Sequence, residues 1–270
     1  MKERISLVAV DLDGTLLRSD GSLAPRGATL LQRAAHGGVH VVLATTRNPD
    51  SVQRFCRLLE IEDPIICTNG AQVWGSPDGP IWACYCIPRE VALLIAQWAD
   101  AHNWELSTTV GLMTYLRQRP GQVPGQIAPS RVIVPSNSEA IVGEPVRILV
   151  WQPKAIESIR SLCQSTFSTQ CRTETYYSPD GNVQSLGIFA PQADKGTALA
   201  LVLNRLAIKR RQVLVIGDNT NDLAMFLYAG VSVAMANAMN EIRRRADAVA
   251  PSNDDEGVAW ALETFVLGQL

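Results

Sequence analysis

A series of short, almost wholly apolar segments, alternating with helical patterns, constrains the fold most strongly. Residues 5–10, 39–45 and 65–68 are apolar, and segments 25–36 and 49–59 between them have the apolar spacing of amphipathic helices. Strands this apolar are typical of parallel sheets that are covered on both faces. The order strand–helix–strand–helix–strand therefore predicts an α/β fold with parallel strands.

The middle of the chain interrupts this alternation. Its strand-like segments alternate in polarity as half-exposed strands do, and residues 118–145 are rich in Pro, Gly and Ser and only weakly patterned. The first pattern returns near residue 191. We therefore expect a core domain formed by 1–82 and 190–270, and an inserted α+β domain formed by 83–189.

Composition excludes several classes of protein. The chain has 270 residues, a formal net charge of −2 and no long run of one sign, which argues against nucleic-acid binding and against a polybasic membrane anchor. No apolar stretch reaches the roughly 18 residues of a membrane span, and the N-terminus does not resemble a signal peptide. The six cysteines are expected to be free thiols of a cytoplasmic protein. The sequence indicates no oligomeric state.

Polar residues follow the predicted strands, at the ends where open parallel sheets form binding sites. Asp11 and Asp13 follow the first strand, and Thr45, Thr46 and Arg47 follow the second. The last part of the chain adds a lysine at the start of a helix and a group of polar residues at and after the end of the strand predicted at 213–218. These residues are Lys195, Asp218, Asn219, Asn221 and Asp222. Three separate regions would thus deliver these side chains to one crevice.

This set of side chains predicts phosphoryl transfer. Clustered carboxylates repel one another unless a cation lies among them, and all-oxygen ligands from Asp11, Asp218 and Asp222 favour Mg²⁺. The Lys195 ammonium and the Thr45 hydroxyl suit phosphate oxygens. One Asp can attack phosphorus, and a second can protonate the leaving oxygen and then activate water.

Each residue taken alone also has a structural interpretation. Asp13 suits a turn, Thr45 suits a helix cap, and a lone Lys195 is usually solvated. A calcium-binding loop starting at Asp11 would need Gly and an acid where Leu16 and Ser22 stand. The order of all the motifs together favours the phosphoryl-transfer site.

The motifs resemble those of the haloacid dehalogenase (HAD) superfamily of phosphohydrolases. These are DLDGT at 11–15, a Thr after the second strand, a Lys ahead of the GD pair, and GDNTND at 217–222. The long insertion resembles the Cof-type branch with a type IIB cap, as do four further segments: TNGA at 68–71, DKGTAL at 194–199, AMANA at 234–238 and SNDDEGVAWAL at 252–262.

The resemblance implies a Rossmann-like core with a mainly parallel sheet and an inserted cap that selects the substrate. It implies that Asp11 is the nucleophile and Asp13 the general acid/base. The phosphate-binding positions correspond to Thr45, Thr46, Lys195 and Asn221. The implied Mg²⁺ ligands are Asp11, the Asp13 backbone carbonyl, and Asp218 with Asp222 in support.

One position departs from the usual pattern. The branch usually has Thr-Gly-Arg after the second strand, whereas this chain has Thr45-Thr46-Arg47. Glycine there permits close backbone approach to phosphate, so Thr46 changes the expected loop. Two roles stay open for Arg47, which are contact with an anionic group of the substrate and an ordinary salt bridge.

The expected function is that of a Mg²⁺-dependent phosphatase. Its substrates would be small phosphorylated metabolites, such as sugar phosphates or phosphorylated cofactors, and Asp11 would form an aspartyl-phosphate intermediate. Two alternatives stay open: a phosphotransferase or phosphomutase that uses the same Asp pair, and a non-catalytic binding protein on the same fold.

Overall fold

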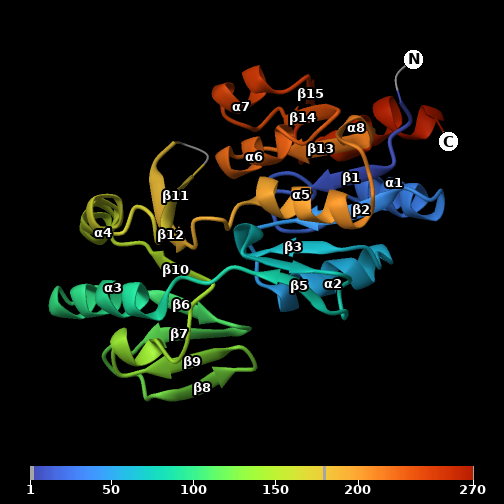
Figure 1. Cartoon of the computed structure of the whole chain (residues 1–270). Coiled ribbons are helices and arrows are strands. Elements are labelled where there is room, and N and C mark those ends of the chain that lie inside the picture. Colours follow the sequence, from blue (N-terminus) through green and yellow to red (C-terminus); the bar gives the residue numbers. More distant parts are fainter. Residues whose placement is uncertain (1–2, 179–180, 270) are drawn as a thin grey trace. The chain divides into compact units, whose positions relative to one another are not determined.

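The computed structural model describes residues 3–178 and 181–269 of the chain. Within them the fold is α/β, as the sequence predicts, with helices packed on two sheets (Figure 1). Its backbone contacts divide the chain into two compact units, unit 1 (Met1–Ala83 and Asp194–Leu270) and unit 2 (Cys84–Ala193). The boundaries expected from the sequence, 82/83 and 189/190, lie close to these divisions.

Unit 1 contains an eight-stranded sheet in the order β15-β14-β13-β1-β2-β3-β4-β5. Neighbouring strands from β15 to β3 are parallel, and β4 runs antiparallel to β3. The strands are β1 (Leu7–Val10), β2 (His40–Ala44), β3 (Ile65–Cys67), β4 (Gln72–Trp74), β5 (Ile81–Cys84), β13 (Val213–Gly217), β14 (Val231–Met235) and β15 (Ala248–Ala250). Since β2 lies on one side of β1 and β13 on the other, β1 and β13 form the switch point where open α/β sheets bind ligands.

Helices cover both faces of this sheet, because successive strand side chains point to opposite faces. Val8 and Val10 of β1 join the apolar cluster of one helix layer, formed by α1 (Pro25–His36), α2 (Pro49–Leu59) and α8 (Gly257–Phe265). Leu7 and Ala9 join the cluster of the other layer, formed by α5 (Lys195–Arg205), α6 (Leu223–Phe226) and α7 (Asn240–Arg245). All four β1 side chains are fully buried.

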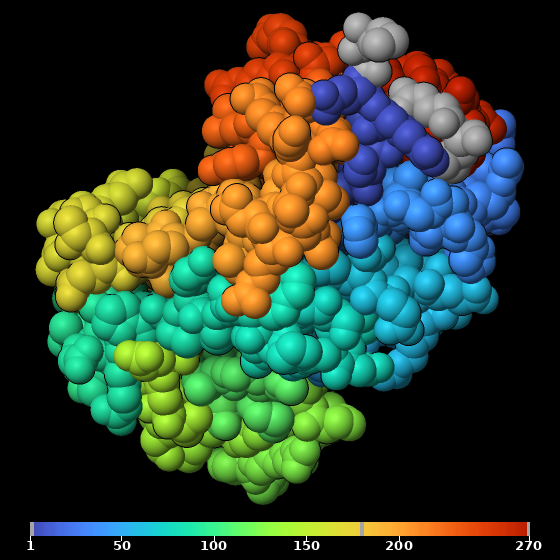
Figure 2. Space-filling view, turned by 45° about the vertical axis from the view of Figure 1, so that its right-hand side comes forward, coloured from blue at the N-terminus to red at the C-terminus, as the bar shows by residue number. Residues whose placement is uncertain are grey.

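The two sequence-distant parts of unit 1 are joined next to β1 and β13. Figure 2 shows the blue N-terminal segment beside the orange segment that precedes β13. The Ser6 N–H donates to the Gln212 carbonyl at 2.8 Å, and Arg211 Nε lies 2.5 Å from Glu3 Oε2. These contacts extend the β1–β13 pairing beyond the strands.

Unit 2 is an α+β unit with a seven-stranded sheet in the order β11-β12-β10-β6-β7-β9-β8. Its strands are β6 (Ser107–Val110), β7 (Met113–Arg117), β8 (Gly125–Ala128), β9 (Arg131–Val134), β10 (Arg147–Val150), β11 (Arg172–Tyr177) and β12 (Val183–Phe189). Neighbours are antiparallel except β7 and β9. One apolar cluster joins this sheet to α3 (Arg89–Ala101) and α4 (Pro153–Thr166).

Short 3₁₀ helices complete the described elements: η1 (Thr68–Gly70), η2 (Ser138–Ala140), η3 (Arg210–Gln212), η4 (Thr220–Asp222) and η5 (Leu267–Gln269). Of these, η1 directly follows β3, and two residues separate η4 from the end of β13. Both contribute residues to the site described below. None of the described helices is both long and apolar enough to cross a membrane.

Candidate active site

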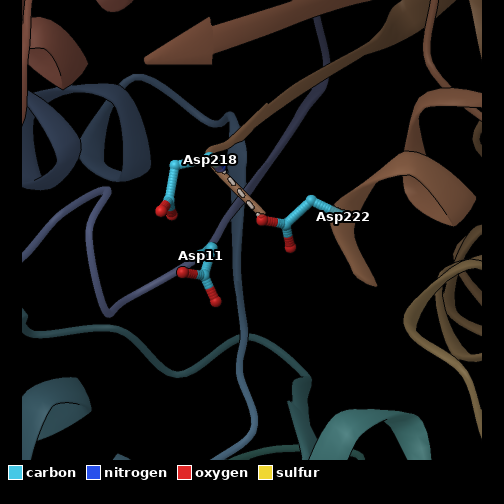
Figure 3. A group of neighbouring side chains, drawn as sticks. All are labelled: Asp11, Asp218 and Asp222. Atoms are coloured by element: carbon cyan, nitrogen blue, oxygen red, sulfur yellow. Dashed lines mark hydrogen bonds between the residues drawn. The ribbon is translucent and has the colours of Figure 1, made fainter. Parts of the chain in front are cut away.

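Three carboxylates gather at the carboxyl ends of β1 and β13 (Figure 3). Asp11 directly follows β1, Asp218 directly follows β13, and Asp222 ends η4. One oxygen from each of the three lies within 4.8 Å of the others. Asp11 and Asp222 are buried and Asp218 is half-buried, so their charges are poorly solvated.

Lys195 places a buried ammonium between two of these acids. Its Nζ donates to Asp11 Oδ1 at 2.6 Å and to Asp222 Oδ1 at 2.7 Å, and its side chain is 1% exposed. Asp194 caps the start of α5 by accepting from the Thr197 N–H, which fixes the backbone that carries Lys195. Burial lowers the pKa of Lys195, but Asp11 and Asp222 outweigh this effect and raise it above its usual value.

The cluster carries an excess of negative charge. Burial raises the pKa of Asp11 well above its usual value although Lys195 lowers it, and burial together with Asp222 raises the pKa of Asp218 to about 7. One ammonium for three carboxylates leaves two formal negative charges. A divalent cation would balance them, and oxygen-only donors are the kind that Mg²⁺ accepts. The residues present therefore fit a divalent metal ion.

The backbone around Asp218 is shaped for close packing. Gly14 has φ +82°, and a Cβ there would lie 2.4 Å from Asp218 Oδ2, so only glycine leaves room for this carboxylate. Thr15 Oγ1 donates to Asp218 Oδ1 at 2.7 Å. Asp222 Oδ2 accepts from the backbone N–H groups of Asp218 and Asn219, both at 3.0 Å, and Figure 3 shows the first of these bonds. Asp222 thus positions Asp218.

The loop after β2 brings Arg47 to Asp13. Arg47 Nε and Nη2 donate to the two Asp13 carboxylate oxygens at 2.8 and 2.5 Å, and the guanidinium lies 5.2 Å from the Phe55 ring centroid. The hydrogen bonds that Arg47 donates to Asp13 raise the pKa of Arg47. Thr45 is fully buried, and its Oγ1 accepts from the Arg47 N–H at 3.2 Å. Thr46 is half-buried between them.

The segment after β3 adds a residue that was not among the predicted site residues. Asn221 Nδ2 donates to Asn69 Oδ1 at 2.9 Å, and the Asn69 N–H donates to the Thr45 carbonyl at 3.0 Å. Asn69 belongs to the TNGA segment at 68–71, directly behind a strand of the parallel sheet. The position of Asn69 after a strand end could have marked it as a candidate site residue, because the other candidate residues also follow strand ends.

All the predicted site residues belong to unit 1 and lie on the loops at the carboxyl ends of its parallel strands or at the start of α5: Asp11, Asp13, Thr45, Thr46, Arg47, Lys195, Asn221, Asp218 and Asp222. Direct bonds link Lys195 to Asp11 and Asp222, and a separate ion pair links Arg47 to Asp13. Their individual catalytic roles stay predictions.

The chain matches a family model described as haloacid dehalogenase-like hydrolase over residues 8–262. Among curated proteins, the 5-amino-6-(5-phospho-D-ribitylamino)uracil phosphatase YcsE of Bacillus subtilis is 26% identical over 263 residues, which are 97% of this chain and 96% of that protein. Among solved structures, TM0651 of Thermotoga maritima is 25% identical with a TM-score of 0.80, and the match covers 96% of this chain and 97% of that one. The HAD subclass IIB sugar phosphatase BT4131 is 20% identical with a TM-score of 0.79, over 98% of this chain and 100% of that one.

These matches extend over nearly the whole chain and include both units. They confirm the enzyme class that the sequence predicts, a HAD-type phosphoric monoester hydrolase. Because the family model spans residues 8–262 and the curated relatives match almost the whole chain, the chain belongs to the haloacid dehalogenase-like hydrolase family, in its Cof-type branch.

Proposed function

We propose that this protein is a Mg²⁺-dependent phosphatase that hydrolyses small phosphomonoesters through an aspartyl-phosphate on Asp11. The observation that carries the proposal is the buried cluster in which Lys195 bonds Asp11 and Asp222 beside Asp218. The names of two relatives, a 5-amino-6-(5-phospho-D-ribitylamino)uracil phosphatase and a sugar phosphatase, support sugar phosphates or phosphorylated cofactors as the substrate class.

The first step forms a bond from Asp11 to phosphorus and breaks the bond from phosphorus to the ester oxygen. Lys195 holds Asp11 at Oδ1, so we assign the attack to Oδ2. Asp13 gives its proton to the departing oxygen, which leaves as an alcohol. Lys195 and the Thr45 hydroxyl stabilise the charge on the phosphoryl oxygens by charge-assisted hydrogen bonds.

The second step returns Asp11 to its starting form. Asp13, now a carboxylate, takes a proton from a water molecule whose oxygen attacks phosphorus, and the bond between phosphorus and Asp11 breaks to release inorganic phosphate. Arg47 donates two hydrogen bonds to the Asp13 carboxylate and thereby orients this side chain. An anionic group of the substrate would compete with Asp13 for Arg47. Arg47 would then have both roles left open above, a salt bridge to Asp13 and contact with the substrate.

A divalent cation would be held by Asp11, Asp218 and the Asp13 backbone carbonyl, with Asp222 positioning Asp218. When bound, Mg²⁺ supplies positive charge next to the phosphoryl group. In this proposal unit 2 is the cap that selects the leaving group. Cytoplasmic location and the absence of nucleic-acid binding stay predictions.

The test is phosphate release from a panel of sugar phosphates and phosphorylated cofactors, with Mg²⁺ and with EDTA. We expect metal-dependent release from a few of them and none from Asp11→Asn, which should keep the fold. Release by Asp11→Asn at the wild-type rate would overturn the nucleophile assignment. Transfer of the phosphoryl group to a second sugar without release to water would instead favour the phosphotransferase alternative.

A further inference from the structure

Two buried side-chain amides at the edge of the site are incompletely hydrogen-bonded. Asn69 is 1% exposed and Asn221 is 9% exposed, and Asn221 Nδ2 donates to Asn69 Oδ1 at 2.9 Å. Within the described part of the chain, Asn69 Nδ2 and Asn221 Oδ1 have no hydrogen-bond partner. A buried polar atom without a hydrogen-bond partner destabilises the fold. The donor Asn69 Nδ2 and the acceptor Asn221 Oδ1 therefore indicate that a ligand binds here.

Asn69 contacts two of the residues that the family resemblance assigns to phosphate binding, Thr45 and Asn221. Its backbone N–H donates to the Thr45 carbonyl at 3.0 Å, and its side chain accepts from Asn221. The adjoining Gly70 packs on the start of α5, since a Cβ there would lie 2.2 Å from the Asp194 carbonyl oxygen and 2.8 Å from the Lys195 nitrogen. Asn69 is therefore fixed where the loops after β2 and β13 meet the start of α5.

The backbone holds Asn69 in a conformation that few residues adopt. Thr68 and Asn69 have φ values of +52° and +58°, in the left-handed region that is uncommon for residues other than glycine, above all for a β-branched threonine. The Thr68 N–H donates to the Arg47 carbonyl at 2.8 Å, and Thr68 Oγ1 donates to Gln72 Oε1 at 3.1 Å. Neighbouring contacts thus enforce the conformation, as is typical of functional sites.

We propose that Asn69 is a further phosphate-binding residue, whose Nδ2–H donates to a non-bridging oxygen of the substrate's phosphoryl group. The inference rests on the proposed phosphatase function and deepens it. Phosphoryl oxygens accept hydrogen bonds, and the atom of Asn69 that needs a partner is a donor. The acceptor left on Asn221 suits the hydroxyl of a singly protonated phosphate.

The decisive variant is Asn69→Gly, because glycine accepts φ +58° without strain while the donor is removed. Titration of inorganic phosphate into the Mg²⁺-loaded protein should show affinity about 10- to 100-fold weaker than wild type, as expected for loss of a hydrogen bond to a charged group. The kcat/KM for a phosphomonoester should fall by a similar factor. Asn103→Gly is the matched control, since Asn103 is an exposed asparagine with the same φ of +58° in unit 2, and it should leave both values unchanged.

A second variant keeps the test decisive if Asn69→Gly does not fold. Asn69→Asp keeps an acceptor for Asn221 Nδ2, removes the donor and adds a negative charge, so it should weaken phosphate binding at least as much. Wild-type phosphate affinity in either folded variant overturns the inference, and so does a wild-type protein that does not bind phosphate. If the wild type hydrolyses a phosphomonoester and both Asn69 variants keep its kcat/KM and phosphate affinity, the role of Asn69 is refuted while the proposed phosphatase function stands. Phosphate binding that depends on Asn69, without hydrolysis of any ester, refutes the proposed function and leaves this inference standing.

Discussion

Replacement of Lys195 by methionine should strongly destabilise the protein near neutral pH. The ammonium lies 2.6 Å from Asp11 Oδ1 and 2.7 Å from Asp222 Oδ1, and the lysine is 1% exposed. Methionine fills similar space without charge, so two buried carboxylates lose their shared cation. Removal of one partner of a buried ion pair costs about 3–5 kcal/mol.

The cost of Lys195→Met should decrease as the pH falls. Burial raises the pKa of Asp11 while Lys195 lowers it, so loss of the lysine raises the pKa of Asp11 further. A carboxyl whose folded-state pKa is raised contributes stability at low pH that is lost as the pH rises through that pKa. The variant therefore gains stability relative to wild type on acidification, because Asp11 binds a proton and its unpaired charge is removed.

The assay is urea unfolding followed by circular dichroism at about pH 8 and about pH 5.5, without metal. Lys154→Met is the matched control, since Lys154 is an exposed lysine of α4, and its effect should stay within about 0.5 kcal/mol. Saturating Mg²⁺ should return part of the stability of Lys195→Met, about 2.7 kcal/mol at 100 times its Kd. A loss below about 1 kcal/mol near pH 8, or an equal loss at both pH values, would refute the reasoning.

Four further predictions concern the same site. Gly14→Ala should weaken Mg²⁺ binding about tenfold or more, because its Cβ would lie 2.4 Å from Asp218 Oδ2; unchanged affinity in a calorimetric titration would contradict this. Asp222→Asn should lower the melting temperature more than Asp218→Asn, because Asp222 accepts from Lys195 and from two backbone N–H groups; equal melting temperatures would count against that positioning role. Mg²⁺ affinity should fall between about pH 8 and pH 6, because the pKa of Asp218 is raised to about 7 and protons compete with the metal; a pH-independent affinity would remove Asp218 from the metal site. Thr46→Gly should hold or raise kcat if the loop after β2 has the family's geometry, whereas a large loss would show a different loop arrangement.

The core of unit 1 was predictable because its strands are buried on both faces. Segment 213–218 was predicted as a strand and β13 occupies Val213–Gly217, with every residue buried. The helix predicted at 49–59 matches α2 at both ends, because Val52, Phe55 and Leu59 mark its buried face. Elements that are buried in this way need apolar residues at regular spacings, and these spacings can be recognised in the sequence.

The segment 118–145 gave no such pattern, yet it contains β8 and β9. Every β8 residue is exposed or half-buried, and Ile133 is the buried residue of β9, so the alternation that marks a half-buried strand is weak there. Tertiary contacts, which one sequence does not display, decide these elements.

The sequence indicated candidate site residues but not the contacts between them. Strand ends and motif order selected Asp11, Asp13, Lys195 and Asp218 as candidates, because chemistry restricts which residue types can serve. The contact of Asp13 with Arg47 depends on side-chain conformations that no local pattern encodes. Asn69 was missed for a similar reason, because its significance lies in a bond to Asn221, 152 positions away in the sequence.

The charge arrangement links the proposed metal and phosphate sites to each other. The buried carboxylates and Lys195 together leave two negative charges, and a phosphate dianion would add two more in a poorly solvated place. Neutral donors such as Asn69 Nδ2 bind phosphate without adding a counter-charge, so they do not compete with the metal for the carboxylates. Phosphate affinity should therefore depend steeply on the Mg²⁺ concentration. The ratio of the phosphate affinity of wild type to that of Asn69→Gly should be the same at every Mg²⁺ concentration.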